Sequence, residues 1–243
     1  MPGWFVTGTD TGVGKTVIAG ALAMLVRRAG LRPGVFKPVA TGCRRDPRLG
    51  LVSEDAEVLA HVADAREDLA TINPVRYAGD LAPMVAGEHT RRPIDWEAIE
   101  RSWERIHTCN DWTIVEGAGG LLVPIDAATN MADLAGRWGL PLVIVTRATL
   151  GTINHTLLTI EAARRRDLTI AAVVVNQYRP SSASLAEETN PEVIGRLAKI
   201  SIPLVVPFDP RTDLRQGAIG TSVLHPLSDF VRTRLADARR KGP

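Results

Sequence analysis

The stretch "FVTGTDTGVGKTV", from Phe5 to Val17, reads as a short apolar strand, a glycine-rich turn and the start of a helix. It closes with the letters GKT (residues 14–16), which end the phosphate-binding pattern G-x-x-x-x-G-K-[ST]. The spacing departs from that pattern by one position, because the first glycine is Gly8 and not residue 9. Glycines let backbone N–H groups point inward, and the following helix adds its positive end. The stretch therefore predicts a nucleotide-phosphate site with unusual spacing.

Short apolar runs alternate with longer helical patterns along the rest of the chain. The runs are rich in β-branched residues and nearly continuous in hydrophobicity, which is typical of parallel strands covered on both faces. They cover residues 4–8, 34–39, 112–117, 141–147, 170–177 and 203–207. The helical patterns cover residues 15–30, 53–65, 95–107, 130–139, 154–167 and 190–200. This alternation predicts an α/β fold with a mostly parallel central sheet and helices on both faces.

The composition bounds the class of protein. A chain of 243 residues is long enough for one sizeable core, so we expect a single domain over 1–243. Hydrophobic residues make up 45% and charged residues 23%, as in ordinary globular proteins. The net charge of +2 gives no electrostatic reason to expect nucleic acid or an acidic membrane as a partner. The basic tail 232–243 fits a solvated helix end.

The membrane and secretory classes are not indicated either. No run reaches the roughly 18 apolar residues of a membrane helix. The N-terminal "MPGWFVTG" lacks the basic and apolar regions of a secretory signal. Cys43 and Cys109 have neither metal-ligand spacing nor a disulfide pattern, which fits a reducing cytoplasm.

Ligands of parallel α/β sheets bind beyond the carboxyl ends of the strands, so polar residues there are the candidates. Lys15 is placed to reach the outer phosphates of a nucleotide, and the Thr16 hydroxyl to ligate Mg²⁺. Glu116 ends the third apolar run, where a second ligand to nucleotide-bound Mg²⁺ is usual, although an ordinary strand-end turn also accounts for a carboxylate there. The segment 41–51, "TGCRRDPRLGL", predicts a mobile surface loop of the kind that borders active sites.

Other polar residues near strand ends have two interpretations each. Lys37 lies near the end of the second strand, which we expect to be the neighbour of the first and to face the phosphates. Asp55 is one turn into a helix that Ser53 can cap, and it is either a metal ligand or a helix-end charge. Asn176 either hydrogen-bonds a base or starts a turn. His155, at a helix start, is more typical of a structural residue.

An ordered set of segments, taken together, resembles the dethiobiotin synthetase family. The set covers the chain from Phe5 to about Pro207, and the region after Tyr178 is less similar to the family. The odd spacing of the phosphate loop is itself a feature of that family. The segments are "FVTGTDTGVGKT", "KPVATG", "SEDA", "INP", "LAP", "VEGAGGLLVP", "MADLA", "LPLVIVTRATLGTINHTLLT" and "VVVNQ".

The resemblance implies a P-loop NTPase-like fold and a ligase of biotin biosynthesis that depends on ATP and Mg²⁺. Its small-molecule substrates are 7,8-diaminononanoate, CO₂ and ATP, and its products are dethiobiotin, ADP and phosphate. One amine captures CO₂ as a carbamate, and the γ-phosphate then activates the carbamate as a mixed anhydride. The second amine attacks, phosphate leaves and a cyclic urea closes. The family works as a homodimer, so we expect the active site at the subunit interface.

The resemblance also assigns roles to residues of this chain. The catalytic residues are Lys37 and Lys15, and the metal ligands are Thr16, Asp55 and Glu116. ATP is expected on Gly12, Val13, Gly14, Lys15, Thr16, Val17, Asp55, Glu116, Gly117, Ala118, Gly119, Asn176, Gln177, Pro207, Phe208 and Asp209. The substrate is expected on Thr11, Lys37, Thr41, Gly119, Gly151 and Asn154. The helix beginning near Asn154 is expected to offer its N-terminus to the substrate carboxylate held by the other subunit.

One departure and one rival accompany this interpretation. Some relatives carry Glu where this chain has Gly12, so an acid–base role is not carried over to that position. The rival is a regulatory P-loop ATPase switch of the chromosome-partitioning or division-site type. Such switches carry a signature lysine four residues before the invariant glycine, where this chain has Asp10. A third class, the cobyrinate amidase-type synthetases, needs a glutaminase region for which 243 residues leave no room.

Overall fold

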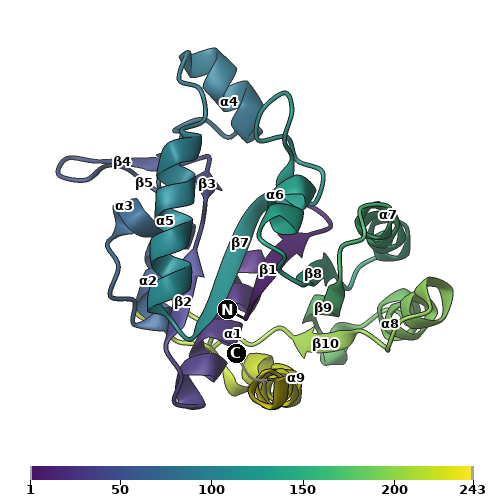
Figure 1. Cartoon of the computed structure of the whole chain (residues 1–243). Coiled ribbons are helices and arrows are strands. Elements are labelled where there is room, and N and C mark those ends of the chain that lie inside the picture. Colours follow the sequence, from purple (N-terminus) through teal and green to yellow (C-terminus); the bar gives the residue numbers. More distant parts are fainter. Residues whose placement is uncertain (1, 242–243) are drawn as a thin grey trace.

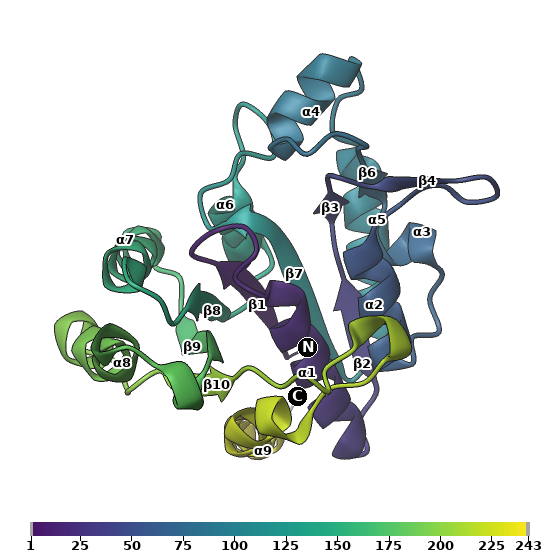
Figure 2. The same cartoon turned by 180° about the vertical axis from the view of Figure 1, so that it is seen from behind.

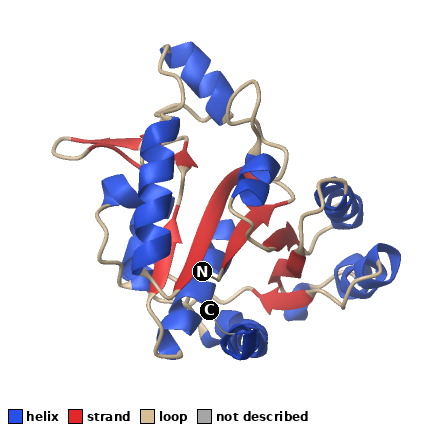
Figure 3. Ribbon diagram, in the orientation of Figure 1, coloured by secondary structure: helices blue, strands red, loops and turns tan. Residues whose placement is uncertain are grey.

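The computed structural model of the chain describes residues 2–241 (Figure 1). Its centre is a six-stranded sheet in the order β10-β9-β8-β1-β7-β2, in which every neighbouring pair runs parallel (Figure 3). The expected α/β architecture with a parallel central sheet is therefore confirmed. The strands are β1 (Gly3–Gly8), β2 (Pro33–Phe36), β7 (Trp112–Gly120), β8 (Leu142–Arg147), β9 (Ile170–Tyr178) and β10 (Leu204–Pro207).

Helices cover both faces of this sheet, and each face has its own apolar cluster. Successive side chains of a strand point to opposite faces, so Trp4 and Val6 of β1 lie in one cluster and Phe5 lies in the other. The first face, in front in Figure 2, is covered by α1 (Lys15–Arg28), α2 (Glu54–Ala63) and α9 (Thr221–Lys241). The second is covered by α5 (Trp96–Cys109), α6 (Met131–Arg137), α7 (Thr152–Arg164) and α8 (Leu185–Ala198).

Helix starts follow local capping, and two starts differ from the sequence prediction. Ser53 accepts a hydrogen bond from the Ala56 N–H and caps α2, as expected. Helix α8 begins at Leu185 and not at residue 190, because Ser184 and Glu187 form a capping box and Pro191 lies inside the helix. Helix α7 begins at Thr152, two residues before the expected Asn154, with Gly151 as its N-cap.

The order of the strands corrects two placements. The neighbours of β1 are β7 and β8, so the expectation that the second strand lies beside the first is wrong. Strand β7 lies between β1 and β2. Glu116 stands opposite Val6 within β7, which continues to Gly120, so Glu116 does not end its strand. Lys37 follows directly after β2, because the strand expected over 34–39 ends at Phe36.

Smaller elements surround the carboxyl ends of the strands. The segment expected as a loop over 41–51 contains an antiparallel hairpin of β4 and β5, and β3 pairs with β6 in a separate two-stranded sheet. Helix α4 stands apart at the top of Figures 1 and 2. Within residues 2–241, no helix is long and apolar enough to cross a membrane. The remaining elements are β3 (Val39–Ala40), β4 (Arg44–Asp46), β5 (Gly50–Val52), α3 (Leu69–Ile72), β6 (Val75–Arg76), α4 (Pro83–Thr90), η1 (Pro180–Ser182) and η2 (Leu214–Gln216).

Candidate active site

The phosphate loop joins β1 to α1, and two glycines and one asparagine fix its shape. Gly12 and Gly14 have φ angles of 73° and 89°, in the left-handed region that favours glycine. The side-chain amide of Asn176, near the end of β9, donates to the Val13 carbonyl oxygen at 3.0 Å. A Cβ atom on Gly14 would lie 2.1 Å from the same amide nitrogen. Any side chain at position 14 therefore disturbs the contact that holds the loop.

Gly14→Ala should weaken ATP binding roughly tenfold or more, because backbone strain and the contact with Asn176 act together. Gly30→Ala is the matched control, since Gly30 has a φ of +79° but nothing lies within 4 Å of its added Cβ. The control carries only the left-handed penalty of about 1–2 kcal/mol. Calorimetric titration with ATP and thermal unfolding of both variants measure the difference. Equal loss of ATP affinity in the two variants would show that the Asn176 contact does not shape the loop.

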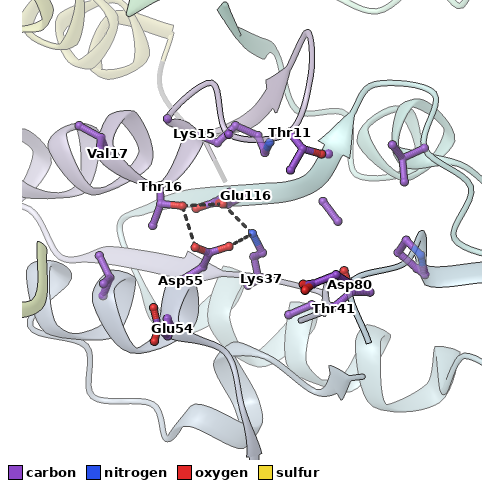
Figure 4. Close-up of a pocket in the computed structure, with 18 of the residues that line it drawn as sticks. Thr11, Lys15, Thr16, Val17, Lys37, Thr41, Glu54, Asp55, Asp80 and Glu116 are labelled. Atoms are coloured by element: carbon purple, nitrogen blue, oxygen red, sulfur yellow. Dashed lines mark hydrogen bonds and ion pairs between the residues drawn. The ribbon is translucent and has the colours of Figure 1, made fainter. Parts of the chain in front are cut away.

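A cavity of about 750 Å³ opens between the phosphate loop, the start of α2 and the segment that precedes α4. It collects much of the site that the sequence predicts, from β7 and from the residues after β1 and β2 (Figure 4). The predicted residues that line it are Thr11, Gly12, Gly14, Lys15, Thr16, Val17, Lys37, Thr41, Asp55, Glu116, Ala118 and Gly119.

The other predicted residues lie outside this lining. Val13 is buried, and Gly117 packs against the ring of Phe5. Asn176 and Gln177 lie against Gly14 of the phosphate loop. The remaining five belong to two places, the end of β10 and the start of α7. They are Pro207, Phe208, Asp209, Gly151 and Asn154, of which Pro207 is the last residue of β10.

The centre of the cavity is an ion cluster of one ammonium, two carboxylates and one hydroxyl. The Lys37 Nζ atom lies 2.6 Å from Asp55 Oδ2 and 2.6 Å from Glu116 Oε1. The Thr16 hydroxyl lies 3.0 Å from Asp55 Oδ1 and 3.1 Å from Glu116 Oε1, and its single proton serves one of them at a time. Lys37 is 3% exposed and Glu116 is 1% exposed. Figure 4 shows these four side chains pointing toward one another.

The charges of this cluster do not balance. Burial alone lowers the pKa of Lys37, but Glu116 and Asp55 raise it overall above its ordinary value. Burial raises the pKa of Asp55, and the charge and hydrogen bond of Lys37 bring it below its ordinary value. Glu116 is so deeply buried that desolvation holds its pKa above the ordinary value despite Lys37. One ammonium thus does not fully neutralise two carboxylates, and the more buried carboxylate, Glu116, is the one whose pKa is raised.

The donor set fits a nucleotide-bound Mg²⁺. The oxygens of Thr16, Asp55 and Glu116 converge, and hard oxygen ligands are those that Mg²⁺ prefers. Glu116 Oε2 is buried and has no hydrogen-bond partner within the described chain. No group of three or more His, Cys, Asp or Glu side chains within residues 2–241 has the geometry to hold a metal by itself. Two carboxylates and a hydroxyl, completed by phosphate oxygens, are the way in which such a site binds Mg²⁺.

Lys15 is the second cation of the cavity. Its Nζ atom donates to the Asp10 carbonyl oxygen at 3.2 Å, and it forms no ion pair with any residue from 2 to 241. Burial lowers its pKa, although the charge of Glu116 opposes this. A buried ammonium at the start of a helix, beside left-handed glycines, is an arrangement that binds phosphate.

Three charged residues of the cavity were missed by the sequence prediction. Asp80 lines it beside Thr41, and Glu54 and Arg215 form an ion pair of 3.4 Å between the start of α2 and η2. The first-turn position of Glu54, next to Asp55, was a local signal that points to the same cavity. Arg215 is 161 residues away from Glu54 in the sequence, and no local pattern joins the two.

Asp55→Asn should lower Mg²⁺-dependent turnover by roughly a hundredfold or more if Asp55 is a metal ligand, because it removes a charge from the oxygen set that fits Mg²⁺. Its effect as a helix-end charge is only about 0.3–1 kcal/mol of stability. Glu57→Gln is the control, since Glu57 is another first-turn acid of α2 that pairs with Arg44 outside this cavity. Turnover and thermal unfolding separate the two effects. If the Asp55→Asn protein is less stable but keeps full turnover, Asp55 serves only as a helix-end charge.

The fold and the site together define a class. The central strand of a parallel sheet leads through a glycine-rich loop into a helix. A lysine, a hydroxyl and two carboxylates line the same cavity as the loop. This arrangement is that of a P-loop nucleotide-binding protein. In agreement, the AAA domain family matches residues 3–213.

Comparison with known proteins gives the particular family. The chain is 35% identical to the ATP-dependent dethiobiotin synthetase of Thermodesulfovibrio yellowstonii, over 91% of this chain and 94% of the relative. It is 38% identical to the corresponding enzyme of Bacillus subtilis, over 97% of both chains. The chain therefore belongs to the ATP-dependent dethiobiotin synthetase family. The MinC:MinD cell division protein complex of Aquifex aeolicus shares the fold, with a TM-score of 0.61 and 15% identity over 97% of this chain and 96% of that one.

Proposed function

We propose that the protein is an ATP- and Mg²⁺-dependent ligase that converts 7,8-diaminononanoate, CO₂ and ATP into dethiobiotin, ADP and phosphate. The observation that carries the proposal is the cavity that is lined by the phosphate loop and by the buried Lys37, whose ammonium pairs with the two carboxylates that also contact Thr16. Phosphoryl transfer needs alignment and charge neutralisation more than covalent help from the protein. Membership of the synthetase family supports a carbamate of the diamine as the acceptor.

The phosphate end of ATP is assigned to the loop. The N–H groups of residues 12–17 and the Lys15 ammonium receive the phosphates, because Lys15 has no carboxylate of its own within residues 2–241. Thr16, Asp55 and Glu116 would hold Mg²⁺, which would supply positive charge to the phosphates of ATP. The closed, buried position of Glu116 strengthens its interaction with any cation that enters.

We assign the diamine and its carbamate to the part of the cavity beside Lys37. One amine of the diamine adds to CO₂, loses a proton and becomes a carbamate. A carbamate oxygen attacks the γ-phosphorus and ADP leaves, and the second amine then attacks the carbonyl carbon and expels phosphate. Lys37 stabilises the charge that develops on the carbamate and on the transferred group. Thr11, Thr41 and Gly119, which line the cavity beside it, contact the substrate.

Base recognition is assigned to the ends of β9 and β10. Asn176 and Gln177 lie beside Gly14, so a base that extends from the phosphate loop in this direction meets them. Phe208 is 43% exposed and stacks under the Arg179 guanidinium at 3.6 Å. Both carboxylate oxygens of Asp209 are engaged by Arg211, which fixes the shape of the segment from Pro207 to Asp209.

The active form is proposed to be a homodimer with shared sites. Gly151, the N-cap of helix α7, is in a left-handed conformation, and a Cβ there would meet nothing within 4 Å. First-turn N–H groups have no intrahelical acceptor and bind anions. Gly151 and Asn154 lie outside the lining of this chain's own cavity, so the carboxylate that they receive belongs to the substrate of a partner subunit. Exposed apolar side chains around this helix include Leu150 and Leu158, which are 88% and 61% exposed.

The cellular setting and domain organisation complete the proposal. Both cysteines, which lie within residues 2–241, are free thiols, and Cys109 is exposed, which supports a reducing cytoplasm. The catalytic unit is one domain over 1–243. The second candidate function is a regulatory ATPase switch, which the shared fold with a cell division complex favours. Asp10 at the position of the signature lysine of such switches argues against it.

The experiment is a labelled turnover. The protein is incubated with ATP, Mg²⁺, ¹³C-bicarbonate and 7,8-diaminononanoate, and the products are analysed by mass spectrometry. The proposal expects dethiobiotin that carries the label in its ureido carbonyl. Hydrolysis of ATP without any labelled cyclic urea would reject the proposed activity.

A further inference from the structure

The Lys37 ammonium occupies the space between the groups assigned to the metal. Its Nζ atom is 2.6 Å from one oxygen of Asp55 and 2.6 Å from one oxygen of Glu116. The Thr16 hydroxyl contacts the same Glu116 oxygen and the other oxygen of Asp55. Figure 4 shows the four side chains closed into one ring of contacts. The cation between the two carboxylates is thus already present in the chain itself.

An ammonium and a divalent cation cannot share these oxygens. Two cations within a few ångströms of each other repel strongly on the buried Lys37–Glu116 side of the site, although the Asp55 side chain is 45% exposed. Lys37 and Glu116 are 3% and 1% exposed, so solvent screening is weak here. A metal ion that takes Asp55 and Glu116 as ligands therefore has to break two short ion pairs.

We propose that Lys37 is the counter-ion of the metal site in the nucleotide-free protein, and that the metal enters only by displacing it. This inference rests on the proposed function, because that function assigns Thr16, Asp55 and Glu116 to the metal. Free Mg²⁺ has too little to gain from two carboxylates already paired with Lys37. A metal–nucleotide complex adds the contacts of its phosphates with Lys15 and the loop, and these offset the broken pairs. The substrate that the free site accepts is therefore the metal–nucleotide complex.

The same displacement prepares Lys37 for its second role. While Lys37 is paired, Asp55 and Glu116 neutralise its positive charge, and this charge is not available to a carbamate. Once the metal takes those carboxylates, the ammonium needs new anionic partners, and the γ-phosphate and carbamate are the anions that enter the same cavity. Lys15 does not act in this way, since its Nζ bonds a backbone carbonyl and no carboxylate from 2 to 241. Metal entry and release of Lys37 are thus one event.

The test measures Mn²⁺ binding in the absence of nucleotide, by electron paramagnetic resonance of the free ion. Lys37→Met should bind Mn²⁺ roughly tenfold or more tightly than the unsubstituted protein, because the competing cation is gone. Lys37→Arg, which keeps the charge, should bind no more tightly than the unsubstituted protein. Lys199→Met is the matched control, since it makes the same chemical change at an exposed helix end. A folded Lys37→Met protein whose Mn²⁺ affinity is unchanged or weaker would overturn the inference.

A second measurement uses the unsubstituted protein, in case Lys37→Met does not fold. The ammonium resonance of Lys37, identified by its loss in Lys37→Arg, is followed by nitrogen NMR of the lysine side chains. It should shift on addition of ADP with Mg²⁺, and should stay in place on addition of ADP with a metal chelator. The same shift with and without metal would overturn the inference. Failure of the labelled turnover would reject the dethiobiotin activity alone, because metal displacement is measured without the diamine.

Discussion

Replacing Lys37 by glutamine should abolish dethiobiotin formation, with a loss of turnover of roughly 10²–10³-fold or more, while ATP still binds. Lys37 is 3% exposed and its ammonium pairs with Asp55 and Glu116, so its loss removes no hydrogen bond to the loop amides or to Lys15. What is lost is the charge that stabilises the carbamate and the transferred group. Binding of the metal–nucleotide complex should not weaken, because the ammonium that competes with the metal has been removed.

The comparison variant is Lys15→Gln, which should weaken ATP binding itself. Lys15, the first residue of α1, bonds through Nζ to the Asp10 carbonyl oxygen and to no other residue from 2 to 241, so its charge is available to phosphates. Calorimetric titration with Mg²⁺ and a non-hydrolysable ATP analogue, together with turnover, measures both effects. Breaking a buried ion pair can cost about 3–5 kcal/mol, so thermal unfolding of Lys37→Gln is recorded with and without Mg²⁺. Equal losses of ATP affinity in the two variants would contradict this division of roles.

Two inactive variants should restore activity to each other when they form mixed dimers. Gly151→Asp places a negative charge at the start of α7, where we propose that the substrate carboxylate of the partner subunit binds. Lys15→Ala removes the phosphate-loop ammonium. In a two-fold symmetric dimer with shared sites, a mixed pair has one site with both lesions and one site with neither. Random exchange makes about half of the dimers mixed, so roughly a quarter of normal activity should return.

The measurement is subunit exchange of the two purified variants, followed by assay of dethiobiotin. Each variant is first shown to be folded and dimeric by itself. Differently tagged subunits then establish that mixed dimers have formed. Mixed dimers without any activity would show that Gly151 does not serve the site of the other subunit. Activity in Gly151→Asp alone would show that the start of α7 is not an anion site.

The central part of this structure can be read from the sequence because it depends on local signals. The apolar runs give the six strands of the main sheet, and the glycine-rich turn after the first of them gives the phosphate loop. Ser53 caps α2 and so places Asp55 in the first turn, beside Thr16 of α1. The motif around Glu116 lies on β7, the direct neighbour of β1. These residues lie close together because the segments that follow parallel strands all lie at the carboxyl edge of the sheet.

What the sequence did not predict depends on long-range packing or on a competing local rule. The insertion of β7 between β1 and β2 is a property of the whole sheet. The sequence therefore led us to expect the strand that precedes Lys37 directly beside β1, where β7 lies instead. The helical pattern was expected to begin at residue 190, but the Ser184 capping box starts α8 earlier and Pro191 is accommodated inside the helix. The bond between Asn176 and Val13 joins residues 163 positions apart. The pairing of Lys37 with two of the three proposed metal ligands, Asp55 and Glu116, joins residues from three separate segments, and no local pattern predicts it.

The most direct test of the account is the dependence of phosphate release on the diamine. Purified protein is given ATP, Mg²⁺ and bicarbonate, and phosphate is measured with and without 7,8-diaminononanoate. If the cavity aligns ATP with a carbamate, phosphate release should be slow without the diamine and should rise steeply with it, one phosphate for each dethiobiotin formed. Rapid phosphate release that the diamine leaves unchanged would contradict the account and favour the ATPase switch.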